Sequence, residues 1–326
     1  MANIVVDCHC HLTVDASSKN VIALRLKLLQ EYNDHEFWLM TTYWNDCDLV
    51  KLHLLDCPNI IPFFGIHPWY SHLYTVSDEP IFKEQHYMEV LSPSPPASLI
   101  AALPEPKRLS EQITKWKTII DSFGGKRKFG IGEIGLDKVF RVPYGILGYT
   151  DKANSNCYVS MDHQVAIFKR MLQLAQEYHV PVLVHCVRAH GRLFDETISI
   201  TRAKPKSNRE RKREQQMGTS DNAPKKVEIP IILHSWSGLV DQVKMWCKYP
   251  GIFFSVSNWI NGQRSLEWAE AVQAITELDF GIDNWLLNKS SDYDENMEEI
   301  CEKLQKVGVS SAQCQINMKR VWAEQL

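Results

Sequence analysis

Several features are scarce or missing in this chain of 326 residues, and each absence excludes a class of protein. No apolar run approaches the roughly 20 residues that a membrane-spanning helix needs, so we expect no membrane association. The net charge of only −3 gives the chain as a whole no strong attraction for nucleic acid or anionic lipid. The nine cysteines form no zinc-finger motif, and the N-terminus lacks the basic start of a secretory leader. We therefore expect reduced thiols and a cytoplasmic or nuclear protein.

The chain contains short apolar runs of strand length that alternate with amphipathic segments of helical period. The clearest helix is predicted over 162–179, where Val165, Phe168 and Met171 share one face. Alternating strands and helices indicate parallel βαβ units, and eight strands in a chain of this length predict a (β/α)8 TIM-type barrel. The predicted strands are residues 3–6, 36–42, 60–65, 128–134, 180–184, 229–233, 251–257 and 283–287. Residues 76–106 are predicted to be a variable connection, and residues 266–278 a helix.

Histidine or glutamate stands at or just after the end of many of these strands. The residues in this phase are His9, His11, His67, Glu133, His185 and His234. In a parallel barrel the carboxyl ends of all strands meet at one mouth, where the active site lies. Histidines scattered through a core would have no reason to keep this position, so the pattern predicts one shared site.

Imidazoles combined with a carboxylate are ligands for zinc, manganese or iron, and for magnesium where more oxygen ligands join. A site of this kind keeps a coordination position for water and lowers the pKa of that water to about 7. Glu133, as a bridging carboxylate, is a candidate to hold two ions about 3.5–4 Å apart. Such centres hydrolyse phosphoesters or amides.

The motifs that carry these residues resemble those of the TatD-type metal-dependent hydrolases, which belong to the amidohydrolase-like barrels. The matching segments, in chain order, are residues 7–12 (DCHCHL), 65–69 (GIHPW), 130–137 (GIGEIGLD), 182–185 (VLVH), 232–238 (ILHSWSG) and 251–257 (GIFFSVS). The segment His185–Gly191 (HCVRAHG) is more similar to the fungal branch of the family than to its bacterial DNases. That fungal branch is named for binding a subunit of the anaphase-promoting complex.

The resemblance implies a role for each residue. His9 and His11 would bind a first metal ion, Glu133 would bridge, and His185 and His234 would bind a second. His67 would contact the substrate phosphate, and Asp137 would support the site from behind its ligands. The implied activity is that of a metal-dependent deoxyribonuclease, often exonuclease-like, with DNA as the substrate and Zn, Mg or Mn as the cofactor.

The segment after the predicted eighth strand departs from the family pattern. The family has Leu-Glu-Thr-Asp-x-Pro there, and its Asp is a metal ligand and the base for water. This chain has LLNKSSDYD over 286–294, without the Glu and the Pro. With two extra residues allowed, Asp292 takes the position of the Asp, as metal ligand and catalytic base; Asp294 is a further candidate. Without a carboxylate there, general-base help of about 10²–10⁴-fold is lost.

A strongly basic segment interrupts the pattern between the fifth and sixth strands. Residues 202–228 carry nine Lys and Arg side chains within 202–226 and almost nothing apolar, which predicts a disordered surface insertion in a single barrel domain spanning 1–326. It is either a solvated loop or a nucleic-acid contact or nuclear localisation signal.

Three functions remain open on the sequence alone. The first is a metal-dependent nuclease or related phosphoesterase. The second is a catalytically weakened barrel that serves as a protein-interaction partner, as the resemblance to the fungal branch allows. The third is a metallo-amidohydrolase for a small cyclic amide, although Glu133 stands where many of those enzymes have a carboxylated lysine.

Overall fold

The computed structural model describes most of the chain. The described ranges are 5–12, 35–44, 57–145, 154–201, 229–249, 251–261, 274–276 and 290–323, with isolated residues at 23, 26–27, 29–30, 32, 46, 48, 50, 265–266 and 269. The predicted basic insertion at 202–228 and the predicted eighth strand at 283–287 lie outside these residues. The single-domain organisation over 1–326 therefore stays a prediction.

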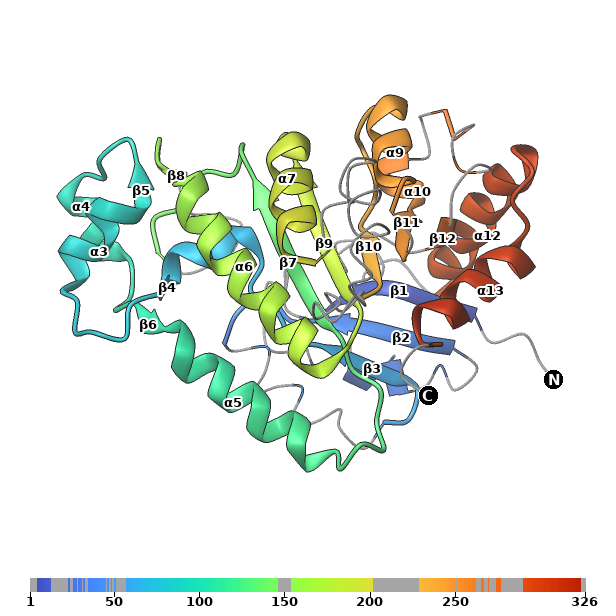
Figure 1. Ribbon diagram of the computed structural model, residues 1–326, viewed down its shortest axis with the longest axis horizontal. Helices are drawn as coiled ribbons and strands as arrows, with labels where there is room; N and C mark the ends of the chain where they lie inside the picture. Colours follow the sequence, from blue (N-terminus) through green and yellow to red (C-terminus); the bar gives the residue numbers. More distant parts are fainter. Residues whose placement is uncertain are drawn as a thin grey trace, which may run out of the picture.

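Eight parallel strands within the described residues follow one another around the molecule in chain order (Figure 1). They are β1 (Val5–His11), β2 (His35–Met40), β3 (Ile60–Phe63), β7 (Ile131–Asp137), β9 (Val182–Val187), β10 (Ile231–Leu233), β11 (Ile252–Val256) and β12 (Ala274–Thr276). The first three form one sheet and the last five another. A parallel bridge between Phe63 and Gly130 joins β3 to the second sheet, and β12 contacts β1. The fold is the predicted (β/α)8 TIM-type barrel.

The helices of the barrel pack against its outer surface. They include α5 (Leu109–Ser122), α6 (Met161–Tyr178), α7 (His190–Thr201) and α9 (Val240–Trp246). The prediction for α6 is confirmed: its N-cap, Ser160, accepts a hydrogen bond from the backbone N–H of His163, and the predicted apolar face is buried. At the other end, His179 takes a left-handed conformation that ends the helix.

The barrel interior is filled at one end and carries histidines at the other. Trp38 and Phe63 point inward and meet Trp322, which directly follows α13 (Ser311–Val321), with ring centroids 5.3 and 6.0 Å from that of Trp322. Lys128, which precedes β7, lies over the same Trp322 ring, so this plug is at the amino ends of the strands. The carboxyl ends are left to the polar residues of the site. Two further described helices, α10 (Asn258–Asn261) and α12 (Ser290–Lys306), follow β11 and β12 in the chain.

The predicted connection over 76–106 is wrong in part, because it contains two helices. They are α3 (Lys83–Val90) and α4 (Ala97–Ala102), and they form a small lobe beside the barrel (Figure 1). The lobe also holds the antiparallel pair of short strands β5 (Leu91–Ser92) and β8 (Tyr158–Val159). The 3-10 helix η1 (Pro68–Leu73) and strand β4 (Tyr74–Thr75), which pairs with β6 (Lys107–Arg108), pack on the main core. Tyr87 and Leu99 anchor the lobe's own apolar cluster. These apolar residues decide the local structure despite the surrounding prolines and serines.

The helix predicted over 266–278 is also wrong at its end, where the structure has strand β12. Ser255 of β11 pairs with Ile275 in a parallel ladder that supplies the backbone hydrogen bonds a helix would otherwise make. Tertiary pairing thus overrides the helical spacing of this segment.

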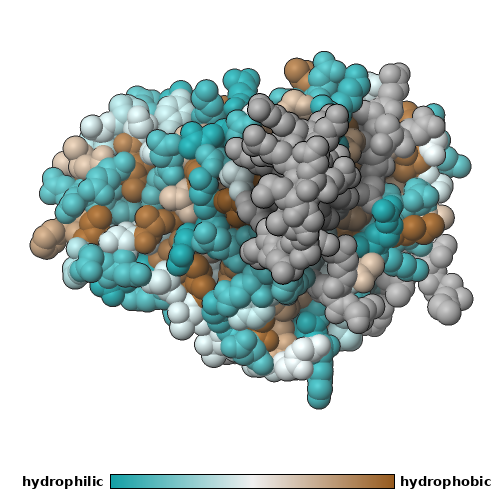
Figure 2. Space-filling model, in the orientation of Figure 1, coloured by the Kyte–Doolittle hydropathy of each residue, from teal (hydrophilic) through white to brown (hydrophobic). Residues whose placement is uncertain are grey.

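The surface in Figure 2 is mostly hydrophilic, with hydrophobic residues scattered among polar ones in small groups. Within the described part of the chain, no helix is both long enough and apolar enough to cross a bilayer.

Three histidines, of which His72 and His86 are buried and His163 is half-buried, connect the small lobe to the barrel through η1. His86 donates a hydrogen bond from Nε2 to the carbonyl of His72 at 2.8 Å, and His163 on α6 donates one to the carbonyl of Ser71 at 3.0 Å. Burial lowers the pKa of all three rings, that of His163 to about 4 and that of His72 to about 3. The three rings are therefore neutral at physiological pH.

Acid is expected to destabilise the protein through these rings. In the unfolded chain each histidine titrates near 6.5, so between pH 6.5 and 4 the unfolded state binds more protons and the free energy of unfolding falls as the pH falls. For His163 the loss reaches about 3 kcal/mol at pH 4. Urea unfolding between pH 7 and 4.5 should show a shallower pH dependence for His163→Gln than for the unaltered protein. If the free energy of unfolding depended on pH equally in the two proteins, His163 would not contribute to the acid sensitivity.

Candidate metal centre

The end of β1 supplies two histidines to the mouth of the barrel. His9 and His11 alternate along the strand, so both rings enter the same space, and both are buried. Their Nε2 atoms lie 3.0 Å apart. Each also faces one oxygen of Glu133: Nε2 of His9 is 3.2 Å and Nε2 of His11 is 2.9 Å from Oε2.

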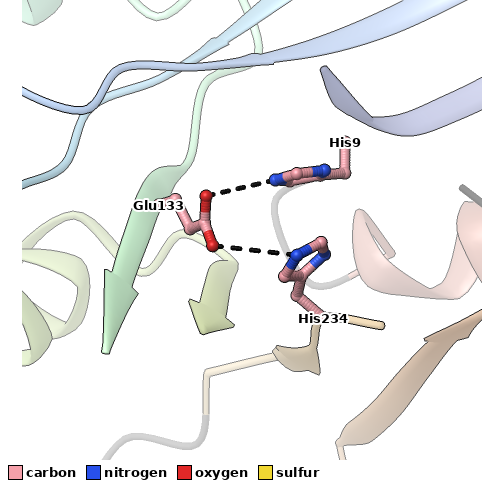
Figure 3. A group of neighbouring side chains, drawn as sticks. All are labelled: His9, Glu133 and His234. Carbon is pink, nitrogen blue, oxygen red and sulfur yellow. Dashed lines mark hydrogen bonds and ion pairs between the residues drawn. The ribbon is translucent and has the colours of Figure 1, made fainter. Parts of the chain in front are cut away.

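Glu133 lies in the middle of the site, on strand β7, with only 1% of its surface exposed. Its second oxygen, Oε1, faces a different set of histidines. His185 Nδ1 is 2.9 Å, His67 Nε2 is 3.4 Å and His234 Nε2 is 3.8 Å from it. Figure 3 shows Glu133 between His9 and His234, with one carboxylate oxygen directed at each ring. The two oxygens of Glu133 thus face different histidines, and the rings of His9 and His234, on the two sides, lie together with centroids 3.8 Å apart.

The charges in this enclosed space depend on one another. Burial alone would raise the pKa of Glu133, but the surrounding rings of His67, His234 and His9 hold it well below its usual value. Burial lowers the pKa of His67 to about 4 and also lowers that of His9. Near neutral pH Glu133 is therefore ionised and the rings of His67 and His9 are neutral, which is the protonation state that metal ligands need.

His185 differs from the other rings because a second carboxylate stands behind it. Its Nε2 lies 3.4 Å from Oδ2 of Asp137, and the same oxygen accepts a 2.7 Å hydrogen bond from the indole of Trp69. Burial would lower the pKa of His185, but the hydrogen bonds to Asp137 and Glu133 raise it to about 9. Asp137 and Trp69 thus fix the orientation of this ring.

The donor set and its spacing fit divalent cations. Two groups of three side chains each bring one ligand atom to within 4.8 Å of one another: His9, Glu133 and His234, and His67, Glu133 and His185. Ligand atoms about 2.0–2.1 Å from a tetrahedral ion lie about 3.3 Å from one another, close to the separations seen here. The Nε2 atoms of His9 and His11 and Oε2 of Glu133 lie 2.9–3.2 Å from one another, so a single cation could be coordinated by all three atoms.

Comparison with known proteins agrees with this geometry. The family model described as TatD related DNase matches residues 6–280, which carry all six of these histidine and glutamate ligand candidates. The chain belongs to the TatD family.

Two curated relatives and one solved structure are informative. The Cut9-interacting protein Scn1 of Schizosaccharomyces pombe is 31% identical over 279 residues, which cover 79% of this chain and 80% of that protein. A protein of Saccharomyces cerevisiae named an uncharacterized deoxyribonuclease is 30% identical over 302 residues, covering 86% of this chain and 85% of its own. The crystal structure of the TatD homologue YjjV from Escherichia coli covers 97% of both chains at 14% identity with a TM-score of 0.54, which supports the fold.

The structure of this TatD-family site includes a polar network that the sequence reasoning did not identify. Ser235, directly after His234, has a φ of 38° and donates its backbone N–H to Oγ of Ser255 at 3.0 Å. Its own Oγ lies 2.9 Å from Oγ of Ser257, and Asn261 donates to the carbonyl of Trp236. The two serines alternate on β11 within the GIFFSVS motif, and this alternation was the available signal. The network fixes the turn that presents His234.

The predicted site residues of this TatD-family chain are brought together, with one exception. His9, His11, His67, Glu133, His185 and His234 share the mouth of the barrel, and Asp137 contacts His185. Asp292 falls in the first turn of α12, but its side chain lies outside the described residues. His67 is as close to Glu133 and His185 as a ligand would be, so its expected role as a phosphate contact stays a prediction.

Proposed function

We propose that this chain is a metal-dependent deoxyribonuclease that hydrolyses phosphodiester bonds with a metal-activated water. The observation that carries the proposal is the position of Glu133, whose two oxygens face two different groups of histidines. A shared carboxylate between two ligand sets is the arrangement of two-metal phosphoesterases. Membership of the TatD family supports DNA as the substrate, as does the name of the Saccharomyces cerevisiae relative.

In this proposal Glu133 would be a ligand shared by the two ions. His9 and His11 complete the ligand set on the Oε2 side, and His185 and His234 complete the set on the Oε1 side. Neutral imidazoles with a bridging carboxylate suit Zn²⁺ or Mn²⁺, and Mg²⁺ if more oxygens join. When bound, such ions lower the pKa of a coordinated water to about 7 and neutralise charge on the phosphoryl oxygens.

The protein's own side chains position the reactants and accept the proton of the attacking water. Asp137 and Trp69 orient His185, and the burial that keeps His67 neutral leaves it able to donate a hydrogen bond to a phosphate oxygen. Asp292 is proposed to complete the metal site and to accept the proton of the attacking water, a contribution of about 10²–10⁴-fold. We further propose exonuclease-like cleavage and a cytoplasmic or nuclear location.

A second candidate function is an interaction protein that retains the metal ligands. Two observations favour it: the segment 286–294 lacks the Glu and the Pro of the family pattern, and a relative of 31% identity carries a name that records an interaction with Cut9. In this alternative the barrel binds a protein partner, and hydrolysis is weak or lost.

Cleavage of end-labelled single-stranded DNA tests the choice between the two. We expect activity with added Mg²⁺, Mn²⁺ or Zn²⁺ that is lost in His185→Ala and falls by about 10²–10⁴-fold in Asp292→Asn. The pattern of labelled products then gives the end preference.

Loss in His185→Ala but not in Asp292→Asn would leave the metal site in place and assign the base elsewhere. An absence of cleavage by protein that contains metal would favour the interaction function.

A further inference from the structure

We infer that a cavity beside the metal centre binds the sugar–phosphate backbone of the nucleic-acid strand that enters the site. This inference rests on the proposed nuclease function and adds a second binding surface to it. The cavity measures about 830 Å³ and is lined by residues from the ends of β7 and β9, from β8 and from the starts of α6 and α7. The residues that carry the argument are Lys138, Tyr158, Met161, Arg188, Gly191 and Arg192.

The cavity adjoins the metal centre through the barrel strands themselves. Lys138 directly follows Asp137, and Arg188 is three residues beyond His185. Strands β7 and β9 pair in parallel with Asp137 opposite Val187, and the backbone N–H of Lys138 continues the ladder by donating to the carbonyl of Val187 at 3.0 Å. Lys138 and Arg188 therefore lie next to each other, directly after the carboxyl ends of β7 and β9, which is the end of the barrel that carries the candidate metal ligands.

The charge left over at the cavity is positive. Asp162, in the first turn of α6, forms an ion pair with Arg192 at 3.0 Å. Glu196 forms ion pairs with Arg192 and with Lys169, at 2.6 Å each, so both acidic side chains are already neutralised. Lys138 and Arg188 are exposed and form no ion pair with the described residues. Helices α6 and α7 add the positive ends of their dipoles, because both begin at the cavity.

The shape and the remaining lining suit a nucleotide rather than a small inorganic anion. Tyr158 and Met161 provide apolar surface beside the cations. Proteins that bind single-stranded nucleic acid combine such surfaces, with aromatic side chains that stack on bases and cations that contact phosphates. Gly191 borders the space, and a Cβ built on it would have nothing within 4 Å. A larger side chain at Gly191 would therefore begin in open space at the border of the cavity.

Binding of a phosphorothioate single-stranded DNA, measured by fluorescence anisotropy on the intact protein, tests the cations. We expect Lys138→Glu and Arg188→Glu each to weaken binding by about tenfold. A plot of the logarithm of the association constant against the logarithm of the salt concentration should become less steep in the double variant, by about 1.4. Each phosphate contact to a single strand contributes about 0.7 to this slope, and two contacts are lost. The matched control is Arg170→Glu, an exposed cation on α6 outside the cavity, which should leave both values unchanged.

Gly191→Leu provides a test that changes no charge. We expect it to weaken binding of the same oligonucleotide by about tenfold or more without lowering the melting temperature, because a Cβ at this position meets open space and leucine is a better helix former than glycine. Unchanged binding in Gly191→Leu together with an unchanged salt slope in the double variant would overturn the inference.

Kinetics separate failure of this inference from failure of the proposed function. The charge reversals should lower kcat/KM on an oligonucleotide at least about tenfold more than on bis(p-nitrophenyl) phosphate, which has no flanking phosphates. Equal losses on both substrates would overturn the cavity's role and leave the nuclease assignment standing. If neither substrate is cleaved, the proposed function fails, and the anisotropy measurements still decide whether the cavity binds the strand.

Discussion

Glu133→Gln is expected to lower phosphodiester hydrolysis by at least about 10³-fold and to lower the metal content of the purified protein. Glutamine keeps the size of the side chain but removes the negative charge on which both histidine groups converge. Each metal site would lose a ligand. A catalytic metal stabilises the charge of the transition state by several kcal/mol, and each loss of about 1.4 kcal/mol slows the reaction by a factor of ten. Metal analysis and the cleavage rate on single-stranded DNA measure the two effects.

Glu84→Gln is the matched control, because Glu84 is an exposed glutamate on α3, outside the cluster. It should leave metal content and rate unchanged. A Glu133→Gln protein that retains two ions and full activity would show that Glu133 is not their shared ligand.

Gly135→Ala is expected to reduce the free energy of unfolding by about 2–4 kcal/mol and to disturb the position of His185. Gly135 has a φ of 146°, and a Cβ built on it would collide with the backbone carbonyl of His185 on the neighbouring strand. The collision would force β7 and β9 apart at the point where Glu133 and His185 meet. Urea unfolding measures the stability, and metal content reports on the site.

Gly191→Ala serves as the control for this substitution, since its added methyl group meets open space on α7. Alanine there should raise stability by up to about 1 kcal/mol, because glycine is the poorer helix former. If the Gly135→Ala protein were as stable as the unaltered protein, β7 and β9 could move apart at this point without a loss in the free energy of unfolding.

The candidate site was largely predictable because its residues keep a constant position relative to the strands. His11, His185 and His234 each stand at or just after the end of an apolar run, and a parallel barrel gathers such positions by geometry alone. The same argument placed Glu133 at the mouth of the barrel, at the end of a strand predicted over 128–134, whereas β7 begins at Ile131 and continues past Glu133 to Asp137. The sequence did not reveal that its two oxygens face different rings, because this depends on how the barrel curves around the carboxylate.

The parts that were missed depend on long-range pairing or on local packing. Strand β12 forms where helical spacing predicted a helix, because pairing with β11 determines its conformation. The role of His67 was assigned from the resemblance, and its position 3.2 Å from Nδ1 of His185 could be known only from the folded chain. Ser255 and Ser257 show a strand alternation in the sequence, but their link to the turn after His234 joins two different strands.

The central claim is that the histidines around Glu133 hold the metal ions that catalyse cleavage of DNA. Its most direct test is the cleavage of end-labelled single-stranded DNA by the unaltered protein before chelation, after chelation and after readdition of Zn²⁺, Mn²⁺ or Mg²⁺. The account predicts that chelation abolishes cleavage and that at least one of these ions restores it, with two ions bound per chain. Cleavage that persists in metal-free protein, or metal-loaded protein that cleaves nothing, would contradict it.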